Sequence, residues 1–419
     1  MKKKLIPIIL VILIIFVISV LAIYNYTEVK KEKLQKENIK KLETSIKSHY
    51  NTYVVTTSKT NLYSKDGDKY IVVGEINKDV KLKLSDIKID SNTKYFQIDF
   101  DDLYIEYDKV KPIEEFIISN RYKNYIPFNI NIKTLDKTSF YDEDDNLIYS
   151  LNKSFDFVVL IKDNERYGVE YNNELMYIHK SDVEKTYNNI NTELKNKTKI
   201  KTLTYHFIYD PNTTECNEII CQTFDQFESH LKYFKENNYF TLKLNELELY
   251  LDGKLQIPEN SVVITIDDGT ILDLGALDLL EKYEANATLF VITNWVDPNH
   301  FKSDNLDLES HTDDMHLPYQ CPGYGSQGGG ILCLPEDVVL KDLKLSQEKL
   351  GGSKYFAYPF FDFNDRAIEL LKKAGFHLAF IGQYDTDGYS YPLKTDKFKV
   401  RRKTIFSNTT MDEFISILK

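Results

Sequence analysis

The run Ile264-Thr265-Ile266-Asp267-Asp268-Gly269 delivers two adjacent carboxylates from an apolar segment into a turn. Val262 and Val263 lengthen the apolar stretch, and the whole pattern predicts a buried β-strand over residues 261–266. Neighbouring residues of a strand point to opposite faces, so the two Asp side chains can take different roles. The fold must therefore bring partners for two carboxylates to the end of one strand.

A second polar motif, His311-Thr312-Asp313-Asp314-Met315-His316, follows about forty residues later. One Asp and two His form a standard three-ligand set for a hydrolytic divalent metal with one open position. On a helix, residues five apart would lie about 140° apart around the axis, so His311 and His316 are expected on a loop or strand end. The plainer interpretation is two surface histidines in an acidic loop, but the chain has only 8 His.

These motifs resemble those of the polysaccharide deacetylase family, carbohydrate esterase family 4. Its first motif is of the Thr-Phe-Asp-Asp-Gly type, and its second is His-(Ser/Thr)-x-x-His or a variant one residue longer. The branch that deacetylates poly-N-acetylglucosamine is similar in this longer spacing and in a Tyr-His near the start of its domain, which Tyr205-His206 matches. The resemblance covers residues 201–419 and implies an α/β fold, a distorted (β/α) barrel with its chemistry at the C-terminal ends of the strands.

The resemblance also implies roles for the matched residues. Asp268, His311 and His316 are expected to bind one divalent metal ion, zinc first, with cobalt and nickel as alternatives. Asp267 is then free to act as the general base. The family's usual proton-donating His near the C-terminus is missing, since no His follows His377, and the poly-N-acetylglucosamine branch gives this role to the early Tyr-His.

His206 is therefore the expected general acid, because amide hydrolysis must protonate the leaving amine. The alternation of Leu203 and Tyr205 places His206 at a predicted strand end. The plainer interpretation, a core histidine beside Tyr205, stays open.

The segment 356–361, Phe-Ala-Tyr-Pro-Phe-Phe, resembles the family's third motif, Arg-x-Pro-Tyr-Gly. The resemblance implies that the segment Tyr358-Pro359-Phe360 lies at the acetyl group, with Tyr358 as a wall of the acetyl pocket. The backbone N–H of Phe360 is expected to stabilise the oxyanion.

Two residues of this segment depart from the family pattern. Ala357 stands where the motif's Arg would orient the catalytic Asp, and Phe361 replaces its Gly and is expected to distort the turn. Arg401 or Arg402 is a candidate substitute for the missing Arg.

All four cysteines lie beyond residue 200, and outside a membrane they are expected to form disulfides. Four cysteines allow three pairings, and close spacing favours Cys216 with Cys221 and Cys321 with Cys333. The glycine-rich stretch between the last two is expected to be a rim loop. Trp295, the only Trp, follows a predicted strand, where it either stacks on a sugar ring or packs in the core.

The N-terminal end predicts a membrane anchor. Three lysines precede the apolar segment Leu5–Tyr24, which as a helix would be about 30 Å long, enough to cross a bilayer. Positive residues stay inside, so the rest of the chain is expected on the outer, wall side of the cell membrane as a single-pass protein. Cleavage after Val20-Leu21-Ala22 is the alternative.

Between the anchor and residue 200, two stretches of short alternating strands echo one another. Thr60–Tyr63 matches Thr138–Tyr141, and the segment from Leu103 matches that from Met176. They resemble two bacterial SH3-like barrels, which either bind wall peptides or serve as spacers. The expected domains are an anchor, 1–27; a charged helical stalk, 28–50; SH3-like domains, 51–115 and 126–187; a linker, 188–200; and a deacetylase domain, 201–419.

The net charge of the chain argues against one class of binding partner. The net charge is −11, and the first 48 residues carry ten Lys and four Glu, so the remainder is strongly acidic. This argues against nucleic acid as a partner, and no nucleotide loop is present. The expected partners are an N-acetylated surface polysaccharide and, through the anchor, the membrane.

The sequence thus predicts a metal-dependent hydrolase that removes N-acetyl groups from a surface polysaccharide. The wall-enzyme architecture places peptidoglycan slightly ahead as the substrate. The histidine spacing and Tyr-His favour poly-N-acetylglucosamine, which is the alternative, and an O-acetyl ester is a further possibility. An alternative of another class is a catalytically silent wall-binding scaffold, suggested by Phe361 and the missing Arg.

Overall fold

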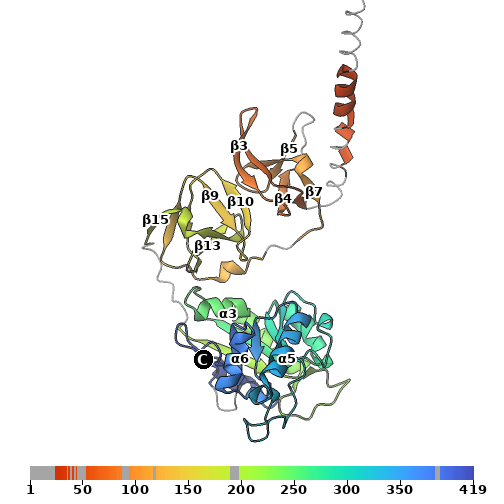
Figure 1. Ribbon diagram of the computed structural model, residues 1–419, viewed down its shortest axis with the longest axis vertical. Helices are drawn as coiled ribbons and strands as arrows, with labels where there is room; N and C mark the ends of the chain where they lie inside the picture. The colour runs from red at the N-terminus through yellow and green to blue at the C-terminus, as the bar shows by residue number, and fades with distance from the viewer. Residues whose placement is uncertain are drawn as a thin grey trace, which may run out of the picture. The chain divides into compact units, whose positions relative to one another are not determined.

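The computed structural model describes residues 24–34, 36–37, 40–41, 44, 53–86, 94–116, 119–188, 198–382 and 387–419 (Figure 1). The chain divides into two compact units. The N-terminal unit comprises 1–122, 130–158 and 165–188, and the C-terminal unit comprises 123–129, 159–164 and 189–419.

The described residues between 24 and 44 are helical. The predicted span Leu5–Tyr24 lies outside the described residues except for Tyr24. Within the described part of the chain, no helix has both the length and the apolar character needed to cross a membrane.

The N-terminal unit is built from short antiparallel strands. The first group is β1 (Tyr53–Thr56), β2 (Thr60–Asp66), β3 (Lys69–Ile76), β4 (Lys81–Asp86), β5 (Tyr95–Ile98), β6 (Leu103–Glu106) and β7 (Val110–Pro112). The second is β8 (Asn131–Thr134), β9 (Thr138–Tyr141), β10 (Leu147–Leu151), β11 (Asp156–Val158), β13 (Arg166–Tyr171), β14 (Glu174–His179) and β15 (Val183–Tyr187).

The internal repeat seen in the sequence corresponds to a repeat in strand pairing. Strand β2 pairs with β6, with Tyr63 opposite Tyr104, and β9 pairs with β14, with Tyr141 opposite Tyr177. The two repeats also share a sheet, because β3 pairs with β10. Gly74 permits this junction, since a Cβ there would lie 2.1 Å from the Ser150 carbonyl oxygen. The SH3-like identity of the repeats stays a prediction.

In the C-terminal unit seven parallel strands close a barrel, which confirms the predicted (β/α) barrel. They are, in order around the ring, β16 (Ile200–Tyr205), β20 (Ser261–Asp268), β21 (Ala287–Val291), β22 (Leu306–Ser310), β23 (Tyr355–Ala357), β24 (Leu378–Gly382) and β26 (Val400–Thr404). β16 pairs with both β20 and β26 and so closes the ring.

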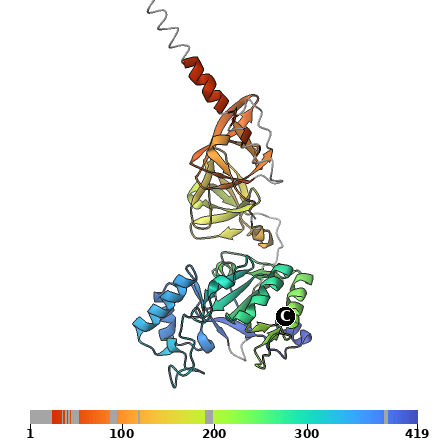
Figure 2. The same ribbon diagram turned by 90° about the vertical axis from the view of Figure 1, so that its right-hand side faces the viewer.

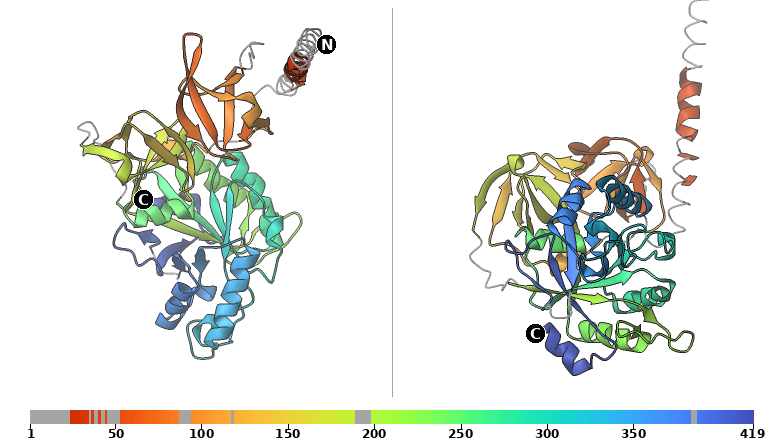
Figure 3. Two further views of the ribbon diagram at one scale, coloured as in Figure 1. Left: turned by 45° about the horizontal axis from the view of Figure 1, so that its top comes forward. Right: turned by 60° about the horizontal axis from the view of Figure 1, so that its bottom comes forward.

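Helices lie outside these strands (Figures 2 and 3). They are α2 (Phe224–Glu236), α3 (Leu244–Leu251), α4 (Gly275–Tyr283), α5 (Glu336–Lys349), α6 (Asp365–Lys373) and α7 (Met411–Leu418). The remaining strands of this unit are β12 (Ile161–Lys162), β17 (Ile208–Tyr209), β18 (Gln222–Thr223), β19 (Phe240–Leu242) and β25 (Tyr389–Ser390).

Local sequence explains where the helices begin and what they cover. The Thr223 hydroxyl caps α2 in a capping box with Gln226, and the side chain of Asn364 accepts a hydrogen bond from the N–H of Ala367 at 2.8 Å to start α6. Phe227, Leu231 and Phe234 recur at helical spacing on α2 and are buried against the strands. Each helix therefore buries one apolar stripe and leaves the strand ends free for polar residues.

Strand β20 continues two residues beyond its predicted end at Ile266. Asp267 pairs with Phe290 and Asp268 with Val291 of the neighbouring strand β21, which extends the ladder through both carboxylates. All residues of β20 are buried. The barrel thus fixes the backbone of both Asp residues before any side-chain contact is considered.

Candidate active site

Three potential metal ligands meet at the C-terminal ends of β20 and β22. Ligand atoms of Asp268, His311 and His316 all lie within 4.8 Å of one another. Asp268 Oδ1 is 3.5 Å from His311 Nε2 and 3.4 Å from His316 Nε2. Both histidines lie in the loop after β22, as their spacing predicts, and not on a helix.

The second contacts of this cluster orient the ligands. His311 Nδ1 lies 2.8 Å from the carbonyl oxygen of Ala357, so Nδ1 carries the hydrogen and Nε2 faces Asp268 with its lone pair. Asp342 on α5 accepts hydrogen bonds from the N–H groups of Asp313 and Asp314, both at 2.8 Å, and so fixes the loop between the histidines. Asp313 itself binds Thr293 and Lys349.

The charges of the cluster suit a cation. Burial would raise the pKa of Asp268, but the neighbouring histidines, His311 first, hold it well below its usual value. Burial, together with His311, lowers the pKa of His316 to about 4, so this ring is neutral at neutral pH. One carboxylate and two imidazoles fit a divalent ion such as zinc, a ligand set that leaves one coordination position open.

Asp267 points away from this cluster and meets Arg402 of β26. The guanidinium donates from Nη1 to Oδ1 at 2.6 Å and from Nη2 to Oδ2 at 2.8 Å, and both side chains are fully buried. Burial would raise the pKa of Asp267, but the charge of Arg402 outweighs it and holds the pKa below its usual value. Asp267 is thus an oriented, ionised carboxylate.

The structure resolves which arginine replaces the one missing at Ala357. Val400, Arg402 and Thr404 alternate inward on β26, whereas Arg401 points outward with 57% of its side chain exposed. Arg402 also lies over the rings of Phe290 and Phe361, at 5.5 and 5.3 Å from their centres. Arg402 of β26 therefore orients Asp267, the role that the resemblance gives to the arginine missing at Ala357.

His206 follows the end of β16, next to the strand that carries both Asp residues. It is buried, and among the described residues none forms a hydrogen bond with its Nδ1. Burial lowers its pKa, against the raising effects of Asp267 and Asp268. Tyr205 points the other way, and its hydroxyl lies 3.2 Å from His230 Nδ1 of α2.

The predicted third motif is divided between core and site. Tyr358 is fully buried in a hydrophobic cluster, and its hydroxyl donates to the carbonyl oxygen of Phe398 at 3.2 Å. This side chain therefore packs in the core and does not form the expected wall of an acetyl pocket. Pro359 is buried as well. The ring of Phe360 lies 4.3 Å from that of His316, which places this side chain beside the ligand cluster.

Phe361, which replaces the family's Gly, adopts the backbone conformation that a Gly would favour. Its φ is +60°, and that of Phe360 is +56°. The ring packs where a Cβ on Gly382 would lie 2.9 Å from it, and it covers the Arg402 guanidinium. The substitution therefore leaves the turn intact and adds a lid over the buried ion pair.

The disulfides join Cys216 with Cys221 and Cys321 with Cys333, the pairings that close spacing favours. The loop closed by the second is not free. Asp362 accepts hydrogen bonds from the N–H groups of Ser326, Gln327 and Gly328 at 2.6, 2.9 and 3.3 Å. The loop is thereby tied to the segment that carries Phe360.

Sequence reasoning missed Asp273. Its buried carboxylate accepts hydrogen bonds from the N–H of Ile208 at 2.9 Å and from the N–H of Thr270 at 2.8 Å. It therefore links the loop after His206 to the loop after Asp268. Burial raises the pKa of Asp273 to about 7. Only its position five residues after Asp268 could have drawn notice.

Residues 254–379 match the family described as polysaccharide deacetylase. A protein named poly-beta-1,6-N-acetyl-D-glucosamine N-deacetylase from Staphylococcus aureus is 32% identical over 179 residues, covering 37% of this chain and 59% of that protein. The protein of the same name from Staphylococcus epidermidis is 32% identical over 197 residues, covering 41% and 66%. The matches thus span roughly three-fifths of the first relatives' length.

A solved structure of a polysaccharide deacetylase from Bacillus cereus is similar at a TM-score of 0.44 with 17% identity, covering 86% of this chain and 100% of that one.

Proposed function

We propose that this chain, whose residues 254–379 match the polysaccharide deacetylase family, hydrolyses N-acetyl groups of poly-β-1,6-N-acetyl-D-glucosamine with a divalent metal ion. The observation that carries the proposal is the cluster of Asp268, His311 and His316 beside the buried pair of Asp267 and Arg402. The names of the relatives support the substrate.

The preference for peptidoglycan drawn from the sequence is not supported. It rested only on an architecture that resembles wall enzymes, whereas the curated relatives carry the name of the β-1,6-linked polymer. The alternative drawn from the histidine spacing and from Tyr205-His206 therefore becomes the main proposal.

Asp268, His311 and His316 would hold the ion, with zinc the first candidate and cobalt and nickel next. When bound, the ion would supply a Lewis acid for the acetamide carbonyl and lower the pKa of water. Asp268 is the one carboxylate among these three ligands and its pKa is held low, so a bound divalent ion would keep net positive charge for this chemistry.

Asp267 accepts the proton of the attacking water in this scheme. Arg402 keeps this carboxylate ionised and fixes its direction, which a base needs. His206 donates a proton to the nitrogen as the C–N bond breaks, and the products are acetate and a free amine. Burial makes the His206 imidazolium a stronger donor but a scarcer one at neutral pH. The N–H of Phe360 is proposed to donate to the oxyanion.

The two departures from the family pattern that suggested a catalytically silent scaffold, at Ala357 and Phe361, are both compensated. Arg402 supplies the guanidinium missing at Ala357, and Phe361 keeps the turn conformation of the replaced Gly. Metal binding discriminates further, because a silent domain has no need to retain an intact ligand set.

We further propose that the chain is anchored in the cell membrane by residues 5–24 with the catalytic unit outside. Its support is the apolar run after Lys2-Lys3-Lys4. Treating intact cells with an added protease tests it: cleavage of the catalytic unit is expected, and full protection would contradict it.

The test of the function is acetate release from poly-β-1,6-N-acetylglucosamine and from peptidoglycan side by side, with zinc added. Acetate from the first polymer at a rate well above that from the second is the expected result. Acetate from peptidoglycan alone would contradict the proposed substrate. Bound metal without acetate from either polymer would contradict the proposed deacetylase activity.

A further inference from the structure

The only Trp of the chain lies at the surface beside the proposed metal ligands. Trp295 is 50% exposed, and its ring lies 5.5 Å from that of His316 in an edge-on arrangement. Core packing, the plainer interpretation of this residue, does not account for a half-open indole. An indole with an open face beside a proposed reaction centre is suited to stacking on the apolar face of a sugar ring.

The loop that carries Trp295 runs directly beside the loop that carries the ligands. Thr293 donates its N–H to the carbonyl oxygen of Thr312 at 3.2 Å, and Asn294 donates its N–H to that of Asp313 at 3.1 Å. The Asn294 side chain also binds Asp314 at 3.1 Å. These bonds hold Trp295 in fixed register with the proposed reaction centre.

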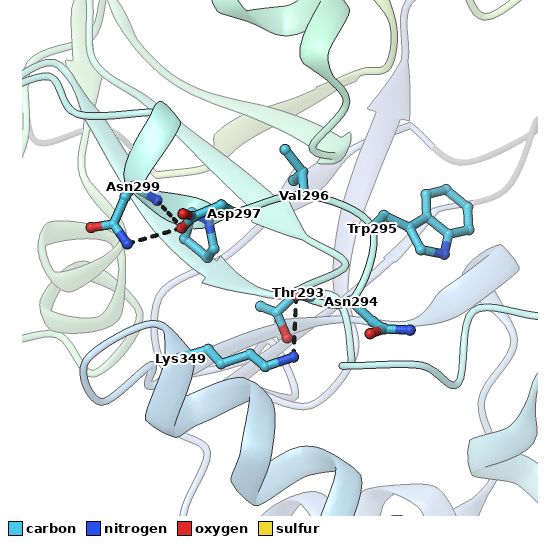
Figure 4. Close-up of a pocket in the computed structure, with 8 residues that line it drawn as sticks. Thr293, Asn294, Trp295, Val296, Asp297, Asn299 and Lys349 are labelled. Atoms are coloured by element: carbon cyan, nitrogen blue, oxygen red, sulfur yellow. Dashed lines mark hydrogen bonds between the residues drawn. The ribbon is translucent and has the colours of Figure 1, made fainter.

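Trp295 also lines an open pocket of about 530 Å³ formed by the loop after β21 and by Lys349 of α5 (Figure 4). The lining combines the indole with the polar side chains of Asn294, Asp297 and Asn299. Asp297 and Asn299 are already ordered by a hydrogen bond of 2.9 Å. The Asn294 side chain lies on the same side of the loop as the indole (Figure 4). An aromatic face beside an amide matches a pyranose ring, which has an apolar C–H face and polar hydroxyl and acetamido groups.

We propose that Trp295 and this pocket form a subsite for a neighbouring N-acetylglucosamine unit of the polymer, next to the unit being deacetylated. The inference rests on the proposed function and deepens it. Stacking on Trp295 holds a second sugar and makes the enzyme prefer oligomers to single sugars. A neutral glycan gains no attraction from the net charge of −11, so stacking and hydrogen bonds would have to retain it.

Because the chain has one Trp, its own emission reports on the site. The wild-type full chain is titrated with a β-1,6-linked N-acetylglucosamine pentamer, with the monosaccharide and with a β-1,6-linked glucose pentamer. We expect a saturable change in emission with the N-acetylglucosamine pentamer. The monosaccharide and the glucose pentamer should bind at least about tenfold more weakly. Unchanged emission at pentamer concentrations that saturate acetate release overturns the subsite, and an equal response to the glucose pentamer overturns its ligand class.

The second measurement is the dependence of acetate release on oligomer length. In Trp295→Ala the KM for the pentamer is expected to rise about tenfold with kcat and bound metal nearly unchanged, and Trp295→Phe is expected to recover much of the loss. Tyr391→Ala is the matched control. This exposed aromatic residue follows β25, which pairs with the first residues of β16, at the end of that strand opposite to His206. An equal loss on short and long substrates, or loss of metal, would assign Trp295 to positioning His316 and overturn the subsite.

The two proposals fail in different ways. If the wild type releases no acetate from any oligomer, the proposed function is wrong whatever the emission shows. If it releases acetate while emission and length dependence stay unaffected by Trp295, the function stands and the subsite is wrong.

Discussion

Arg402 and Asp267 of the C-terminal unit form an ion pair with 0% and 1% of their side chains exposed, whereas Lys83 and Asp99 of the N-terminal unit keep 42% and 44% exposed. Burying such a pair costs desolvation free energy that its attraction rarely repays. The core of the N-terminal unit uses aromatic contacts instead, such as Phe140 stacked on Tyr171 at 4.5 Å. Charge is buried where the proposed chemistry needs an oriented carboxylate.

Backbone conformation separates the two units in the same way. In the N-terminal unit, positive φ angles outside glycine fall on Asp and Asn residues, including Asp145 and Asn172, which tolerate this conformation in turns. In the C-terminal unit they include Thr312, Phe360 and Phe361, residue types for which a positive φ costs conformational free energy. Such strain gathers at functional sites and depends on the surrounding structure to hold it.

Removing a metal ligand should produce the largest effect. The wild type is expected to bind one equivalent of zinc, and His311→Ala to bind none at stoichiometric concentration and to release no acetate. Metal content after dialysis measures this. His179→Ala is the matched control in the N-terminal unit, where His179 contacts Asp145. Full zinc retention in His311→Ala would show that the ligands lie elsewhere.

Arg402→Met tests the buried pair. It leaves Asp267 charged and unpaired, so the free energy of unfolding should fall by roughly 3–5 kcal/mol and acetate release by about 1,000-fold. Urea unfolding and acetate assays measure the two losses.

Arg401→Met is the control for this variant, because Arg401 is exposed and should change stability by less than about 0.5 kcal/mol. Adding Asp267→Asn to Arg402→Met should recover part of the stability and none of the activity. Equal effects at both arginines would remove the distinction between buried and surface charge.

His206→Ala tests whether His206 acts as the general acid while Asp267 acts as the general base. Loss of a general acid should slow amide hydrolysis by about 100- to 10,000-fold, but it should barely affect an activated aryl acetate, whose leaving group needs no proton. Asp267→Asn should slow both reactions. Parallel rates on the two substrates, with metal content checked, measure this. Equal losses in His206→Ala would make His206 a base or a structural residue.

The smallest expected effect lies in the N-terminal unit. Burial raises the pKa of Glu174 to about 7, so its carboxyl stabilises the fold below the pKa of the unfolded chain and loses this contribution as the pH rises through 7. Glu174→Gln should therefore raise the free energy of unfolding at pH 8 by about 1 kcal/mol, with a smaller gain at pH 5. Stability curves at both pH values measure it, and a gain independent of pH would contradict the cause.

Much of the site could be predicted because its residues are adjacent in sequence or follow clear patterns. The apolar run before Asp267 and the spacing of His311 and His316 were sufficient to predict a strand end and a loop. Arg402 could also have been chosen over Arg401, since the alternation of Val400, Arg402 and Thr404 puts the former on the inner face.

Other features depend on contacts that sequence does not show. The junction of β3 with β10 at Gly74, the link that Asp273 makes between two loops, and the packing of Phe361 against Gly382 all join segments distant in the chain. Tyr358 looked like a site residue because it lies in the motif, yet directly after β23 its side chain packs into the core.

The most direct test of the central claim is acetate release from poly-β-1,6-N-acetylglucosamine by the wild type and by Asp267→Asn, at equal bound zinc. Asp252→Asn serves as control, because Asp252 pairs with Lys397 at 3.1 Å, away from the cluster. We expect Asp267→Asn to lose about 1,000-fold in kcat/KM with its metal retained, while Asp252→Asn stays near the wild type. An unchanged rate in Asp267→Asn, or no acetate from the wild type, would contradict the account.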